Sequence, residues 1–245
     1  MKIVIASDSF KGSLSSIEVA EAAKRGVKAA YPDCEVVAVN VADGGEGTVE
    51  AVVEALGGEI VRCMVSDPLG RPIQARYGIA GEKAIIEMAA ASGLPLLQPA
   101  ERNPWMTSTY GTGEMIMDAI QKGCRQFLVG IGGSATNDAG TGMLQALGFK
   151  FFDFNGQEIT DCRGGRLQGI ADLDDSCVPE AVREAEFIVA CDVDTPFCGP
   201  EGAAPVFAPQ KGADAEMVAK LDAGMASFAN VIEAKYGIHI VPIAG

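Results

Sequence analysis

The chain opens with two alternations of a short apolar segment and a longer segment of helical periodicity. Residues 2–6 are apolar and mostly β-branched, and an amphipathic segment follows as far as residue 30. Residues 35–41 repeat the strand pattern, and residues 48–56 repeat the helical one before Gly57 and Gly58. Two such β-α units in tandem predict parallel strands in a Rossmann-like arrangement.

The pattern changes after residue 59. Residues 59–79 and 83–89 alternate like shorter strands, and the turn at residues 67–70 gives them an antiparallel character. We therefore expect an α/β fold of two domains. Residues 1–65 form the Rossmann-like βα portion, and residues 66–245 form a mixed α/β domain that contains the glycine-rich loop.

Three further elements are predicted in the second portion. A helix capped by Thr112 runs to Lys122, residues 187–192 form a buried strand that ends in a carboxylate, and residues 214–236 form the final helix.

A glycine-rich loop is the strongest functional signal. The apolar strand that begins at Phe127 runs into five glycines over residues 130–142. Glycine permits positive φ, and consecutive free N–H groups ahead of a helix bind anions, phosphates above all. The candidate phosphate-binding residues are Gly130, Gly132, Gly133 and Ser134.

The composition of the chain limits the kinds of molecule that it is expected to bind. The formal net charge of -14 argues against nucleic acid and anionic membranes as partners. A small anionic substrate needs local positive charge, and Lys11, Arg71 and Lys211 are cations that lie beside glycine. Whether the chain forms a homo-oligomer stays open.

Cysteine and histidine usage points to a reducing compartment. The seven cysteines are scattered without a C-x-x-C pair, and His239 is the only histidine. Neither a zinc site nor histidine-based catalysis is expected. The start of the chain shows no signal peptide and no apolar stretch approaches a membrane span, so we expect a cytoplasmic protein.

Polar side chains recur in the loops that follow strands. Carboxylates at the ends of several strands can hold Mg²⁺ against substrate phosphates. A run of hydroxyls before the helix at residue 112 suits hydrogen bonds to phosphate or polyol oxygens. These candidates are Asp8, Asp43, Glu46, Asp138 and Asp192 among the acids, and Thr107, Ser108 and Thr109 among the hydroxyls.

A dinucleotide site is an alternative interpretation of the same loop. Gly130, Gly132 and Ala135 match the G-x-G-x-x-A fingerprint, and Asp153 lies at the offset of a ribose-binding acid. This pattern is typical of NAD-dependent oxidoreductases. Several residues between Asn137 and Gly142 are poor helix formers, which argues against a helix that starts inside the fingerprint.

Several long motifs together carry a family resemblance. DSFKGSLS from Asp8, VADGGEGT from Val41, DPLGRP from Asp67, RNPWMTSTYGTGEMI, GIGGSATNDAGTGML from Gly130 and FAPQKGA from Phe207 closely resemble the bacterial class I glycerate kinases. The resemblance spans nearly the whole chain. It implies phosphorylation of glycerate to 2- or 3-phosphoglycerate with ATP and Mg²⁺, in the cleft of a two-domain α/β protein.

The chemistry of phosphoryl transfer, read with this resemblance, suggests individual roles. The glycine loop would cradle a phosphate, with Lys11 and Lys211 supplying positive charge. Asp43, Glu46 and Asp192 are candidates for Mg²⁺ or its waters. Asp8 or Asp138 would be the base, Asp192 a further catalytic acid, Arg71 the partner of the glycerate carboxylate, and Thr107, Ser108 and Thr109 further substrate contacts.

The chain departs from the family pattern in two ways. The family usually has Asn-Pro-Leu where this chain has Thr195-Pro196-Phe197. Family chains also continue past the equivalent of Gly245, so we expect this chain to lack a C-terminal segment that completes the first domain. A non-catalytic nucleotide-binding fragment is therefore a third interpretation, beside the kinase and the oxidoreductase.

Overall fold

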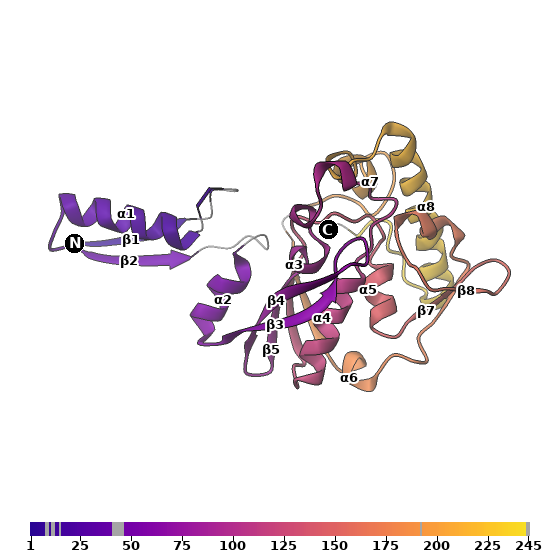
Figure 1. The fold of residues 1–245 in the computed structure, drawn as a ribbon, viewed down its shortest axis with the longest axis horizontal. Coiled ribbons are helices and arrows are strands. Elements are labelled where there is room, and N and C mark those ends of the chain that lie inside the picture. Colours follow the sequence, from indigo (N-terminus) through magenta and orange to yellow (C-terminus); the bar gives the residue numbers. More distant parts are fainter. Residues whose placement is uncertain (8–9, 11–12, 15, 41–46, 192, 244–245) are drawn as a thin grey trace.

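The computed structural model describes residues 1–7, 10, 13–14, 16–40, 47–191 and 193–243. Two strands and a helix lie together at one end of the long axis, apart from the other elements (Figure 1). They are β1 (Lys2–Ser7), α1 (Ser16–Ala30) and β2 (Glu35–Asn40). β1 and β2 pair in parallel along their whole length, which confirms the prediction of parallel strands.

A mixed five-stranded sheet, in the order β10-β6-β5-β4-β3, organises the rest of the described chain. Its strands β5, β6 and β10 are parallel, whereas β3 and β4 run antiparallel to their neighbours. The bounds are β3 (Glu59–Ser66), β4 (Pro72–Ala80), β5 (Lys83–Glu87), β6 (Gln126–Gly130) and β10 (Glu186–Ala190). The predicted fold class, a parallel βα portion plus a mixed α/β portion, is confirmed.

The expected domain boundary between residues 65 and 66 falls inside β3. This strand pairs with β4 from Glu59 to Ser66 and therefore belongs to the larger sheet. The helix before it, α2 (Thr48–Leu56), also packs on this sheet through Val49 and Val53. The division into two domains stays a prediction, and these contacts favour an earlier boundary, ahead of α2.

Two helices cover opposite faces of the larger sheet. Successive side chains of a strand point to opposite faces. Ile85 packs with Val49 and Val53 of α2, whereas Ile86 packs with Met115 of α4 (Tyr110–Gln121) in the main core. The central strand β5 is therefore buried on both sides, as expected where strands are joined through helices.

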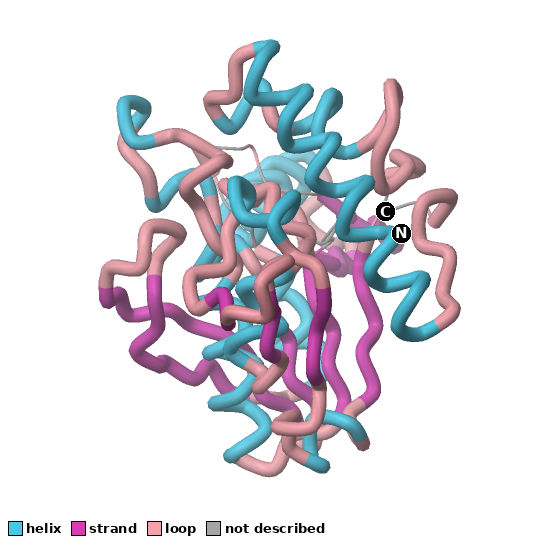
Figure 2. The backbone as a smooth tube through the Cα atoms, turned by 90° about the vertical axis from the view of Figure 1, so that its right-hand side faces the viewer, coloured by secondary structure: helices cyan, strands magenta, loops and turns pink. Residues whose placement is uncertain are grey.

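A second core lies beyond the sheet, around the long helix α8 (Ala215–Tyr236), at the end of the molecule opposite α1 (Figure 1). Figure 2 views the molecule from this side, with the strands running side by side in the lower half. The remaining strands form a three-stranded sheet, and the other elements are short. Their bounds are β7 (Lys150–Phe152), β8 (Glu158–Ile159), β9 (Asp172–Asp174), α3 (Ala89–Ser92), α5 (Thr141–Ala146), α6 (Glu180–Arg183) and α7 (Ala203–Phe207), with 3₁₀ turns η1 (Leu94–Leu96), η2 (Pro99–Glu101), η3 (Gly164–Gly169) and η4 (Pro209–Lys211).

Two local predictions need correction. The strand expected to be buried at residues 187–192 is β10, whose Ile188 and Val189 are 59% and 53% exposed, because the faces of a strand at the edge of a sheet are covered less than those of a central strand. Asp192 lies outside the described residues. The helix expected to start at Thr112 starts at Tyr110 with Thr109 as N-cap. The final helix, expected over residues 214–236, is α8 with Asp214 as its N-cap, and the Asp214 side chain accepts a hydrogen bond from the Met217 N–H.

Within the described residues, no helix combines the length and the apolar character that crossing a membrane requires.

The assignment of the core predicts that an isoleucine-to-alanine substitution lowers the free energy of unfolding more at a buried position than at an exposed one. Ile86→Ala removes a side chain with 0% exposure and should lower the free energy of unfolding by about 2–5 kcal/mol. Ile188→Ala, on the exposed edge strand, is the matched control and should cost less than about 1 kcal/mol. Denaturant unfolding of both variants measures the difference, and equal losses would contradict the assignment.

Candidate active site

The ends of three parallel strands bring the candidate site together. Glu87, Gly130 and Ala190 stand in register at the carboxyl ends of β5, β6 and β10. Ligands of open α/β sheets bind beyond such ends. A cavity of about 300 Å³ lies there, between the sheet, α5, α7 and α8. Its lining consists of Met88, Thr109, Thr112, Val129, Ile131, Ser134, Thr136, Asn137, Asp138, Ala139, Gly140, Met143, Phe197, Ala203, Phe207, Lys211 and Met225.

The loop after β6 folds back sharply before α5. Gly133, Ala139 and Gly140 all have positive φ, and Ala139 is the one such non-glycine residue in the described chain. The Gly133 carbonyl accepts the Leu94 N–H at 2.8 Å, which fixes the loop against η1. Of the predicted phosphate-binding residues, Ser134 lines the cavity, whereas Gly130, Gly132 and Gly133 do not.

Asp138 is a buried carboxylate at the centre of the site. Its Oδ2 accepts hydrogen bonds from the N–H and the hydroxyl of Thr109, both at 2.8 Å, and from the Gly142 N–H at 3.2 Å. Its Oδ1 accepts from the Gly140 N–H at 3.3 Å. Burial raises the pKa of Asp138, and these hydrogen bonds act in the opposite direction. The carboxylate therefore ties the start of α4 to the start of α5.

Lys211 brings a positive charge into the same cavity. Its side chain is buried, and its Nζ donates to the Ser134 hydroxyl at 2.8 Å and to the Thr136 carbonyl at 2.6 Å. Burial lowers the pKa of Lys211 to about 8, and the negative charge of Asp138 opposes this shift. The glycine loop and the FAPQKGA motif, far apart in sequence, thus meet at this ammonium group.

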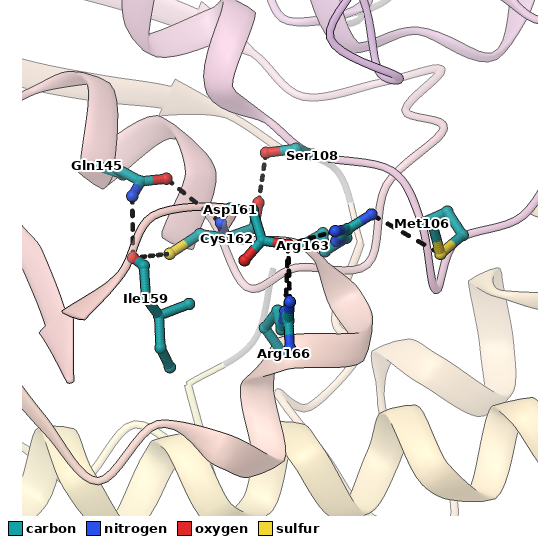
Figure 3. Close-up of polar contacts among 8 residues, drawn as sticks. All are labelled: Met106, Ser108, Gln145, Ile159, Asp161, Cys162, Arg163 and Arg166. Atoms are coloured by element: carbon teal, nitrogen blue, oxygen red, sulfur yellow. Dashed lines mark hydrogen bonds and ion pairs between the residues drawn. The ribbon is translucent and has the colours of Figure 1, made fainter. Parts of the chain in front are cut away.

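The three predicted hydroxyls are already engaged with the protein. Thr107 donates to the Ala135 carbonyl at 2.9 Å, Thr109 donates to Asp138, and Ser108 donates to the Cys162 carbonyl at 2.6 Å (Figure 3). A hydroxyl has one hydrogen to donate. In this arrangement these side chains can only accept hydrogen bonds from a ligand, and only Thr109 lines the cavity.

Arg71 lies outside the cavity and is held by two acids. Its Nε donates to Asp67 at 2.5 Å and one of its Nη atoms donates to Glu101 at 2.6 Å. Hydrogen bonds to Glu101 and Asp67 raise the pKa of Arg71. The turn that carries Arg71 still contacts the hydroxyl loop, because the Ser108 N–H donates to the Pro68 carbonyl at 3.0 Å.

The other predicted site residues lie outside the described residues. They are Asp8, Lys11, Asp43, Glu46 and Asp192.

Comparison with known proteins identifies the family. The sequence profile described as "Glycerate kinase family" matches residues 3–245. The chain belongs to the glycerate kinase family.

Named relatives agree with this assignment. The chain is 49% identical over 239 residues to a glycerate kinase of Bacillus subtilis (strain 168), which covers 97% of this chain and 62% of the relative. It is 46% identical over 247 residues to the glycerate 2-kinase of Escherichia coli (strain K12), covering 100% and 65%. The chain thus spans somewhat less than two thirds of the length of these relatives.

The fold agrees as well. A crystal structure of a protein named as glycerate kinase 2 from Salmonella typhimurium LT2 superposes with a TM-score of 0.90 at 46% identity. The match covers 100% of this chain and 66% of that chain.

The geometry of this family member does not favour the dinucleotide interpretation. A dinucleotide-binding helix presents its N-terminus to the pyrophosphate directly at the glycine fingerprint. Here α5 begins at Thr141, well after Ala135. Asp153, the expected ribose partner, instead accepts the N–H groups of Asn155 and Gln157 in the turn between β7 and β8.

The structure adds site residues that the sequence analysis did not single out. Phe197, Phe207 and Met225 of α8 all line the cavity. Phe207 opens the FAPQKGA motif, so that motif was a signal for it. Met225 lies in an ordinary amphipathic helix, and no sequence signal marks it.

The hydrogen bonds at Asp138 predict a specific loss in Thr109→Val. This change keeps the shape but removes the hydroxyl that donates to Asp138 and accepts from the Met143 N–H at 2.9 Å. We expect the free energy of unfolding to fall by about 1–3 kcal/mol. Thr160→Val, at an exposed position, is the control and should change it by less than about 0.5 kcal/mol. Denaturant unfolding of the two variants checks this.

The lowered pKa of Lys211 predicts a pH dependence of stability. Between about pH 8 and pH 10.5 the unfolded chain holds a proton at this lysine that the folded chain has released. Stability contributed by this residue should therefore rise with pH across that window, by up to about 3 kcal/mol. The difference in unfolding free energy between the wild type and Lys211→Met, followed from pH 7 to pH 10.5, isolates the effect. A flat difference would contradict the lowered pKa.

Proposed function

We propose that this protein is a kinase that transfers the γ-phosphoryl group of ATP to a hydroxyl of glycerate, giving ADP and 2- or 3-phosphoglycerate. The observation that carries the proposal is the buried Lys211 ammonium, bonded to the glycine-rich loop beside Asp138 in a partly apolar cavity. Membership of the glycerate kinase family and the names of the relatives support it.

In the proposed reaction the bond between the γ-phosphorus and the ADP oxygen breaks, and a bond to the glycerate hydroxyl oxygen forms. The hydroxyl proton leaves to a base. Such a transfer depends on positioning and charge neutralisation more than on covalent catalysis. Lys211 would neutralise phosphate charge, and Ser134, Gly130, Gly132 and Gly133 would contribute the surrounding loop.

Asp138 suits a positioning role in this mechanism. Its four hydrogen bonds hold the glycine loop and the start of α4 in one arrangement. Asp8 or Asp138 remains the proposed base, with Asp192 and Lys11 as further catalytic groups. We propose Arg71, Thr107, Ser108 and Thr109 as the substrate side, which requires Arg71 to exchange an acid partner for the glycerate carboxylate.

We include Mg²⁺ in the proposal because metal ions neutralise the charge on the ATP phosphates during phosphoryl transfer. No cluster of three acidic, histidine or cysteine side chains suited to a metal exists in the part of the chain that the structure describes. The proposed ligands Asp43, Glu46 and Asp192 lie outside it. Magnesium with one or two carboxylates would shield the phosphate oxygens. We also infer that the protein acts in the cytoplasm, where ATP and reduced cysteines are found.

The first experiment measures ADP release from MgATP with and without D-glycerate. It is run on this 245-residue chain and on a chain extended by the segment that follows the matched region in the Bacillus subtilis relative. Glycerate-dependent release by both supports the proposal. Release by the extended chain alone keeps the reaction but makes the 245-residue chain a nucleotide-binding fragment. If neither chain releases ADP and NAD stabilises the protein against thermal unfolding, the proposal is overturned.

Lys211→Gln should lower kcat by about 100- to 1,000-fold, since a donor that stabilises transition-state charge is removed. Lys220→Gln is the matched control, because Lys220 is exposed on α8 and pairs with Glu216 at 2.6 Å. Steady-state kinetics of both variants test this in whichever chain is active. A Lys211→Gln enzyme within a few-fold of the wild type would remove Lys211 from the mechanism.

A further inference from the structure

Arg102 carries a buried polar group without a partner. The residue follows η2 directly, and its Nε is buried with no hydrogen-bond partner among the residues that the structure describes. None of the ion pairs among the described residues includes its guanidinium group. Buried polar groups in proteins are nearly always hydrogen-bonded, so an exception requires an explanation.

The other arginines show how unusual this is. Arg71 pairs with Asp67 and Glu101, Arg76 pairs with Glu50, and Arg183 pairs with Asp175. Arg163 and Arg166 share Asp161 (Figure 3). Arg125 donates to backbone carbonyls, and Arg25 and Arg62 are exposed to water. Glu101, the neighbour of Arg102 in sequence, is occupied by Arg71 and by the Gln98 N–H.

The backbone of Arg102 lies against the segment that carries Lys211. Gly212, with φ of 99°, packs so closely on Arg102 that a Cβ at this glycine would overlap the Arg102 carbonyl oxygen. The same added atom would lie 3.1 Å from the Arg102 Cβ. Arg102 and Lys211 are therefore cationic residues on adjoining segments, and Lys211 reaches from there to Ser134 of the glycine loop.

Two cationic residues on adjoining segments, whose backbones pack together at Gly212, suit an anion. A guanidinium that is partly buried and unpaired costs free energy in the free protein, and a planar, bidentate phosphate contact would recover it. In a chain of net charge -14, cations without acidic partners are the places where an anionic ligand meets least repulsion.

We propose that Arg102, which does not itself line the cavity, is a phosphate-binding residue that acts together with Lys211. The identity of the nucleotide rests on the proposed function, whereas the phosphate contact itself does not.

Binding of ADP, adenosine and pyrophosphate, measured by calorimetry, tests the contact without turnover. Arg102→Gln should weaken ADP and pyrophosphate about 10- to 100-fold and leave adenosine unchanged, because a charge-assisted hydrogen bond is removed. Arg102→Lys should recover part of the loss, since it restores the charge but not the fork. Arg62→Gln, which removes an exposed guanidinium, is the control and should bind like the wild type.

Unfolding of the same variants separates binding from structure. If Arg102 acts on a ligand, Arg102→Gln should unfold at the same or a higher denaturant concentration than the wild type. Unchanged ADP and pyrophosphate affinity, an equal loss for adenosine, or no binding of either phosphate probe by the wild type would each overturn the proposal. ADP binding through Arg102 without glycerate phosphorylation would instead overturn only the proposed function.

Discussion

The buried carboxylate of Asp138 is the interaction on which the site depends. A negative charge in the interior is tolerated only when donors surround it, and here Thr109, Gly140 and Gly142 supply four hydrogen bonds. These donors sit at the starts of α4 and α5, where the helix dipole also favours a negative charge. This one group joins the glycine loop to the starts of the two helices, and its charge partly offsets the desolvation of Lys211.

A second constraint is the lack of space around that carboxylate. A Cβ at Gly142 would overlap the Ser108 hydroxyl and approach Asp138, and a Cβ at Gly113 would overlap the Met143 carbonyl oxygen. The glycines of this region therefore permit close packing between α4 and α5 as well as a tight loop. Sequence alone suggested a phosphate cradle, and at Gly142 the structure shows a steric role in addition.

Local patterns predicted the elements well, because their causes are local. The final helix follows from the periodicity of its sequence, and the parallel pairing of β1 with β2 follows from the repeated β-α pattern. The exposure of β10 did not follow, because an apolar strand is buried only if other elements cover it. The hydrogen-bond partners of the hydroxyls could not be predicted from the sequence either, because Ser108 donates to the carbonyl of Cys162, 54 residues away. The meeting of Lys211 with Ser134 needed the tertiary fold, although motif grouping had placed both among the candidates.

The lowered pKa of Lys211 links the fold to the proposed chemistry. The lysine is desolvated, and Asp138 offsets this cost only in part. A phosphate bound beside it would add the missing negative charge and raise its pKa again. Above about pH 8, ligand binding would therefore take up a proton at Lys211, and phosphate affinity should fall as pH rises. The same desolvation that weakens the folded state near neutral pH thus makes the site selective for an anion over a neutral ligand.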